Sequence, residues 1–246
     1  MSIIRGVEYN KLNDLLKDYD KRWRLFFSLL SSQDKELCEF IKTQDREKYN
    51  KIIEVPVTYN KPDEYLFKIA AIINSHSDLI YHDYRFKTIE EYGKKIIKFS
   101  PKIDVYLRDL LKNGLLLEYM KRQKMDIEKP AMYKKISEYM DIENKYANIG
   151  YFLCGFYFNG NKNIKYNSKI YKDYNHFVNS IITDENINEV ADSFQKDCFI
   201  ISWQISSNND DLSIYERFLH VINMFDEKKR TYLKELKIEK NIYQMN

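Results

Sequence analysis

The sequence predicts a mainly α-helical protein, an array of about three imperfect helical repeats of 80–85 residues joined by short β-ribbons. Three observations predict it: glycine and proline are scarce, apolar residues recur at helical spacing, and one apolar framework recurs along the chain. Only 6 Gly and 4 Pro occur among 246 residues, about 4% where average usage gives roughly 12%. Few turn-forming residues imply long elements, and helices are the expected ones.

Internal similarity is clearest between residues 63–97 and 148–182, which align without a gap at an offset of 85. Tyr81 then meets Tyr166, and many other pairs match in apolar character. An earlier copy is indicated by "ELCEFIK", which matches "LLLEYMK" 79 residues later. Because one such unit cannot bury its apolar face alone, stacking of units supplies the core. The sequence therefore predicts a single domain over 1–246, with units at 8–87, 88–172 and 173–246.

Three of the helices predicted for the first unit have distinct sequence signals. An opening helix is predicted by apolar residues at helical spacing, namely Tyr9, Leu12 and Leu16. Ser31 or Ser32 is the predicted N-cap of the next helix, which contains residues 36–42. A strongly apolar helix follows over 62–73, with Pro62 near its start, where a missing N–H costs nothing.

The second unit repeats this plan. Thr88 and Glu91 form a capping-box pattern at the start of its opening helix. Gly114 separates the next two helices and suits a left-handed helix C-terminus. A helix with Pro130 in its first turn comes next, and the apolar helix over 148–158 ends the helical part.

Between the predicted repeat units, the apolar residues no longer follow the helical period. Residues 79–87 and 164–172 are short runs rich in Tyr, Ile and Phe, with polar pairs at their middles. They predict two-stranded ribbons that connect one unit to the next. An isolated ribbon is only marginally stable, so each must pack on the helices.

Charge and cysteine usage limit the function classes. Lys and Arg number 40 against 37 Asp and Glu, a net charge of +3 that is too balanced to predict nucleic-acid binding by itself. Cys38, Cys154 and Cys198 lie far apart in apolar runs, as expected of core thiols in a reducing compartment. No apolar signal region and no run of 18 apolar residues occurs. We expect a cytoplasmic protein with no membrane contact.

Motifs for catalysis are not found. The four histidines lack metal-ligand spacing, and no phosphate-binding or dinucleotide-binding glycine motif and no nucleophile elbow is present. No cofactor, metal or enzymatic activity is therefore predicted. Arg217 and His220 share one helical face, in a spacing shorter than that of helical ribonucleases with an Arg–His pair. A solvated surface pair explains them as well, so a nuclease is the least favoured alternative.

Two basic–aromatic stretches suggest another alternative. "KRWRLFF" places cations around Trp23, and "YMKRQK" places cations beside Tyr119. Arginine beside an aromatic ring can hold phosphate and stack a base; alternatively, Trp23 is core and the cations point outward. A nucleic-acid-associated factor would use Lys21, Arg22, Arg24, Lys121, Arg122 and Lys124.

The leading hypothesis follows from the predicted architecture. Helical arrays present extended surfaces and most often hold another macromolecule. We expect a non-enzymatic protein that binds, scaffolds or inhibits a protein partner, with ribbon residues along one edge as contacts: Tyr84, Arg85, Tyr166 and Lys169. The compositional style resembles that of small proteins carried by phages and mobile elements, some of which inhibit host nucleases.

Overall fold

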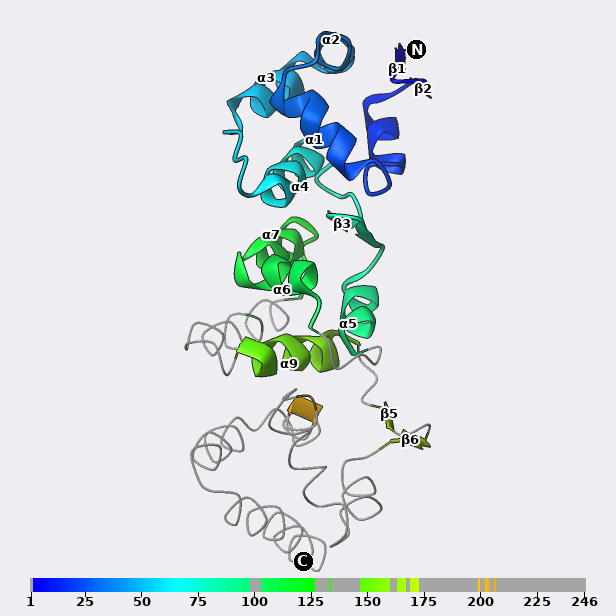
Figure 1. The fold of residues 1–246 in the computed structure, drawn as a ribbon, viewed down its shortest axis with the longest axis vertical. Coiled ribbons are helices and arrows are strands. Elements are labelled where there is room, and N and C mark those ends of the chain that lie inside the picture. Colours follow the sequence, from blue (N-terminus) through cyan, green and yellow to red (C-terminus); the bar gives the residue numbers. More distant parts are fainter. Residues whose placement is uncertain are drawn as a thin grey trace, which may run out of the picture. The chain divides into compact units, whose positions relative to one another are not determined.

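A computed structural model of the chain shows a mainly helical protein with short antiparallel strand pairs (Figure 1). It describes residues 2–97, 103–126, 133, 147–159, 163–166, 169–172, 199, 202, 203 and 206. Among these residues the elements are β1 (Ser2–Ile4), β2 (Val7–Tyr9), the 3-10 helix η1 (Leu12–Lys17), α1 (Trp23–Ser31), α2 (Lys35–Gln44), α3 (Arg46–Glu54), α4 (Pro62–Ile73), β3 (Leu79–Tyr81), β4 (Tyr84–Phe86), α5 (Ile89–Ile97), α6 (Val105–Lys112), α7 (Leu115–Arg122), α9 (Ala147–Asn159), β5 (Ile164–Tyr166) and β6 (Lys169–Tyr171).

The chain divides into two compact units that alternate along the sequence. Unit 1 contains residues 1–88 and 109–130, and unit 2 contains residues 89–108 and 131–246. The predicted helix after Pro130 and the predicted third repeat unit lie outside the described residues, apart from isolated positions. None of the described helices is long and apolar enough to cross a membrane.

The core of unit 1 is centred on α4. This helix starts with Pro62, as predicted, and carries Asp63 and Glu64 in its first turn, where acidic groups complement the helix dipole. It packs against η1, α1, α3 and β3. Leu66 and Ile69 are completely buried, and the Tyr19 hydroxyl after η1 donates a hydrogen bond of 3.2 Å to the Leu66 carbonyl. The apolar period of residues 62–73 thus encodes the element on which unit 1 assembles.

The start of the chain differs from the prediction. The opening helix is a 3-10 helix that begins at Leu12, and Tyr9 belongs to an N-terminal ribbon formed by β1 and β2. The turn of this ribbon uses Arg5 and Gly6, both with positive φ (50° and 80°). A turn of this kind matches the twist of a hairpin, which explains why residues 2–9 form strands.

The predicted N-cap of α2 is also wrong. Asp34 caps this helix, because its carboxylate accepts a 3.1 Å hydrogen bond from the Leu37 N–H. Helix α1 continues through Ser31, and the Ser32 hydroxyl donates to the Ser28 carbonyl at 2.7 Å. The serines therefore satisfy the end of one helix instead of the start of the next.

The described part of unit 2 is built on α5 and α9, which pack closely on each other. A Cβ atom at Gly93 would lie 2.6 Å from the Asn159 amide nitrogen, and one at Gly155 would lie 2.5 Å from Cγ2 of Ile96. The two backbones approach so closely because both crossing positions lack a side chain. The predicted apolar helix over 148–158 is confirmed as α9, and Phe152 and Phe156 on it are completely buried.

Aromatic and polar contacts fix the surroundings of this crossing. Tyr92 on α5 is completely buried, and its hydroxyl donates a 3.0 Å hydrogen bond to the Leu107 carbonyl. The Phe199 ring lies 5.1 Å from the ring of Phe152 at an interplanar angle of 87°. Cys154 is a buried core thiol as predicted, and burial raises its pKa above the usual value. Cys38 is half-buried, and Cys198 lies outside the described residues.

Two further local predictions are confirmed. Gly114 adopts the left-handed conformation (φ 74°) between α6 and α7. Both predicted ribbons are present as β3–β4 and β5–β6, and His82 in the first of their turns also has positive φ (54°).

Candidate functional site: the ribbons and the basic clusters

The three ribbons share one pairing pattern. Each consists of two three-residue antiparallel strands with three opposed pairs. The middle pair of each ribbon places an isoleucine opposite a charged residue: Ile3–Glu8, Ile80–Arg85 and Lys165–Ile170. Because side chains alternate between the two faces of a strand, this pair lies on the face opposite to the other two pairs. We call it the central-pair face.

Each ribbon buries at least one residue on the face opposite to the central pair. Ile4 and Tyr9 are buried in the first ribbon, Leu79, Tyr81 and Phe86 in the second, and Tyr171 in the third. This alternation explains how such short ribbons persist: one face joins the helical core, and the central-pair face is left for another contact.

In β3–β4 the chain itself covers the central-pair face. Ile80 is 1% exposed. The guanidinium of Arg85 donates hydrogen bonds of 3.0 Å to Asp20 Oδ1 and Asp78 Oδ2, and a further one to the Leu16 carbonyl at the end of η1. Partial burial alone would lower the pKa of Arg85, but the hydrogen bonds and charges of the two aspartates raise it above its usual value. Arg85 thus fastens the ribbon to η1.

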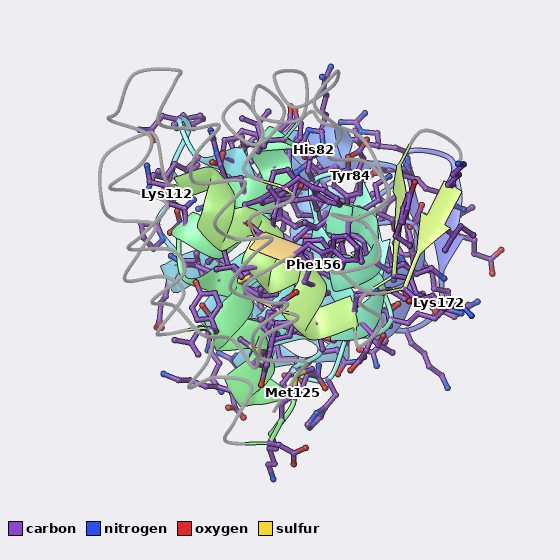
Figure 2. All side chains as sticks on the ribbon, turned by 90° about the horizontal axis from the view of Figure 1, so that it is seen from below. His82, Tyr84, Lys112, Met125, Phe156 and Lys172 are labelled. Carbon is purple, nitrogen blue, oxygen red and sulfur yellow. The ribbon has the colours of Figure 1, made fainter. Side chains whose placement is uncertain are left out.

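The predicted partner-binding residues differ in their availability. Arg85 is engaged within unit 1, as described above. Tyr84, which is labelled in Figure 2, is half-buried. Its ring stacks on that of Phe86 with centroids 5.8 Å apart. Lys169 is exposed. The backbone of Tyr166 pairs with Lys169 across β5–β6, and its side chain lies outside the described part.

The first basic cluster is divided between structure and surface. Trp23 is a core residue, as the simpler alternative predicted, and its Nε1 donates to the carboxylate of Asp63. Arg22 is half-buried and donates a 2.9 Å hydrogen bond to the Tyr9 hydroxyl, near Asp18. Lys21 and Arg24 are exposed. Only these last two cations are placed to receive an anionic ligand.

The second basic cluster is divided in the same way. Arg122 is half-buried with its guanidinium over the Phe67 ring, 5.0 Å from the centroid, and 3.9 Å from Glu118. Burial lowers the pKa of this guanidinium below its usual value. Lys121 and Lys124 are exposed. Within the described part of the chain, the side chains of Arg22 and Arg122 contact no residue in common, so these contacts do not join the two clusters into one site.

One surface residue was not predicted from the sequence. Tyr59, in the loop between α3 and α4, is 73% exposed. Its ring packs against that of half-buried Phe27 on α1, with centroids 6.1 Å apart and planes at 86°. The only signal in the sequence is an aromatic residue within a polar, proline-flanked loop, which is weak in a chain with 21 tyrosines.

Catalytic and metal-binding groups do not assemble in the described part of the chain. No group of three or more His, Cys, Asp or Glu residues that could hold a metal ion occurs there. His82 Nδ1 lies 2.8 Å from Asp83 Oδ1, a contact between neighbours in the ribbon turn. Arg217 and His220, the pair considered for a nuclease, lie outside the described residues.

Comparison of the chain with protein-family models, with curated proteins and with solved structures found no match.

Proposed function

We propose that this chain is a non-enzymatic protein that binds a protein partner, and scaffolds or inhibits it, through the central-pair faces of its ribbons. One observation carries the proposal. The central-pair face of β3–β4 is covered by the chain itself, whereas Ile170 on the corresponding face of β5–β6 is 65% exposed. A surface already used for packing at one ribbon is thus open at another, and exposed apolar residues with a charged rim are typical of interaction sites.

The partner is one that presents the carboxyl end of a short helix with an aspartate beside it. In β3–β4, such a segment, η1 with Asp20, is what the central-pair residue Arg85 binds. Lys172, the residue that follows β6, is exposed and would supply the cation that Arg85 supplies in β3–β4 (Figure 2). Basic side chains favour the negative end of a helix and a neighbouring carboxylate.

We further propose that the predicted repeat units, 8–87, 88–172 and 173–246, arose as helical repeats. Support comes from element spacing: α4, β3 and β4 recur as α9, β5 and β6, and the strand pairs correspond at the offset of 85 found in the sequence. The β1–β2 ribbon pairs in the same register, and a helix begins three residues after β2 and after β4.

The experiment is affinity capture from host cells with purified wild type and matched variants, followed by titration with the captured protein. Ile170→Asp and Lys172→Glu should each weaken binding by about tenfold or more, the effect of a hot-spot residue. Ile53→Asp, on α3 where Ile53 is 45% exposed, is the control for a lost surface isoleucine and should bind as wild type does. Equal capture by all variants, or no captured protein, would contradict the proposal.

A further inference from the structure

We infer that Lys21, Arg24 and Tyr59 form a binding site for single-stranded nucleic acid on unit 1, a site separate from the ribbon faces. The exposed ring of Tyr59 would stack on one base, and the two cations would hold the neighbouring phosphates. We call these three residues, with the supporting ring of Phe27, the α1 platform.

The aromatic part of the platform is anchored in the core. The Phe27 ring contacts both the Tyr59 ring and that of Tyr65, with its centroid 6.1 Å and 5.9 Å from theirs. Tyr65 is 3% exposed, so Phe27 connects the exposed Tyr59 ring to the core. Tyr59 is therefore supported from one side and largely open to solvent, as a stacking platform must be.

The cationic part lies on the same helix as Phe27. Arg24 precedes Phe27 by three residues on α1, a spacing that puts both side chains on one helical face. Lys21 lies just before the helix. The side chains of Lys21 and Arg24 are exposed, and neither makes an ion pair or a side-chain hydrogen bond in the described part of the chain. In contrast, Arg22 between them is used within the fold.

The combination of an exposed aromatic ring with two exposed cations favours nucleic acid over a protein partner. A protein surface could offer carboxylates to the two cations, but a single strand offers both a phosphate and a free base face at every nucleotide. A duplex keeps its base faces stacked inside and could use only the cations. Trp23, the ring that the sequence places among these cations, is buried and cannot serve, so Tyr59 takes its place.

The test is fluorescence anisotropy with a labelled oligo(dT) of about 12 nucleotides at about 50 mM and about 200 mM salt. Wild type should bind, more tightly than it binds a duplex of equal length. Tyr59→Ala should weaken binding about 5- to 140-fold, the range for loss of one stacking contact, and Tyr59→Phe should retain it. Arg24→Gln should weaken binding and reduce the salt slope by about 1.

Matched controls separate this site from general charge and from the ribbon proposal. Arg46→Gln removes the same charge from an exposed position on α3 and should bind as wild type does. Ile170→Asp should leave oligonucleotide binding unchanged. No binding at the lower salt overturns the inference. So does equal loss in Arg24→Gln and Arg46→Gln, an unchanged affinity in Tyr59→Ala, or equal displacement of the oligonucleotide by an acidic peptide of the same charge.

Discussion

Two regions of the molecule share an order of helices and strands, yet different contacts stabilise them. Along the chain, η1 is followed by three helices, α4 and β3–β4, and α5 is followed by α6, α7, α9 and β5–β6. Unit 1 fastens its ribbon by the ion pairs of Arg85, whereas the corresponding residue in β5–β6, Ile170, is exposed. Unit 2 instead brings two helices into backbone contact at Gly93 and Gly155.

The difference shows that the same order of elements can be stabilised by different contacts. Residue 70, which lies 85 before Gly155, is an alanine buried in α4. A methyl group therefore fits at that position in unit 1, while in unit 2 the same methyl group would collide with Ile96 and Ile97. Close helix contact and a charged clasp are thus two separate means of stabilising similar arrangements, and each can be tested by substitution.

The largest effect is expected at the glycine crossing. Gly93→Ala places a methyl group against the backbone of α9, which cannot move aside as a flexible side chain does. Destabilisation of about 2–3 kcal/mol should appear in urea unfolding followed by circular dichroism, as for other overpacked sites. Gly155→Ala should act in the same direction.

The control for this prediction is Ala70→Gly in unit 1, which should cost about 1–2 kcal/mol through helix propensity and the loss of one buried methyl group. If Gly155→Ala were instead to stabilise the protein by the propensity difference, the helices of unit 2 would not be in the close contact described.

The ribbon clasp should give the next largest effect. Arg85→Ala leaves the largely buried carboxylate of Asp20 without its partner, at a cost of about 2 kcal/mol in the free energy of unfolding. Arg85→Lys should recover only part of it, because an ammonium group cannot match the forked contacts to Asp20, Asp78 and the Leu16 carbonyl. The measurement is again chemical unfolding.

The matched substitution is Ile170→Ala in β5–β6, for which a change within about 0.5 kcal/mol is expected of an exposed residue. Similar losses at Arg85 and Ile170 would mean that the two ribbons are held alike, and the comparison would fail.

The first turns of η1 and α5 both carry a carboxylate at the third position, Asp14 and Glu91. The smallest effect is expected for Asp14. Hydrogen bonding to Lys17 and to the backbone N–H of Lys11 and Asn10 lowers the pKa of Asp14 from 3.8 to about 2. The lowered pKa adds stability above about pH 4, which is lost as the pH falls toward 2. Asp14→Asn should therefore be less stable than wild type at pH 7.

Thermal unfolding of both proteins between pH 7 and pH 2 checks this sign. The difference between wild type and Asp14→Asn should shrink as the pH falls through this range. A difference that stays constant down to pH 2 would show that the carboxylate charge of Asp14 does not contribute.

Much of the architecture could be predicted because its signals are local. Period and punctuation alone indicate the helix that begins at Pro62, the turn at Gly114 and the ribbon over 79–87, and all are present. The N-terminal ribbon was missed because Tyr9 fits a helical period with Leu12 and Leu16 equally well. Its turn signal, a glycine after Arg5, was available in the sequence.

The surface was harder to predict than the fold. Arg85 in an edge-like ribbon suggests a free contact residue, and only the fold brings it to Asp20, 65 residues away in sequence. The serines before α2 were plausible caps until the end of α1 was known. Tyr59 has no periodic partners, and its role depends on a ring from another element. Properties that depend on long-range pairing are the ones a single sequence leaves open.

The interleaving of the two units has a consequence for biosynthesis. Unit 1 needs residues 109–130, yet residues 89–108 of unit 2 are translated before them. The amino-terminal unit therefore cannot be completed on the ribosome until part of its neighbour has already emerged. Cutting the gene anywhere between codons 89 and 130 would leave both units incomplete. To express one unit by itself, both of its chain segments must therefore be supplied together.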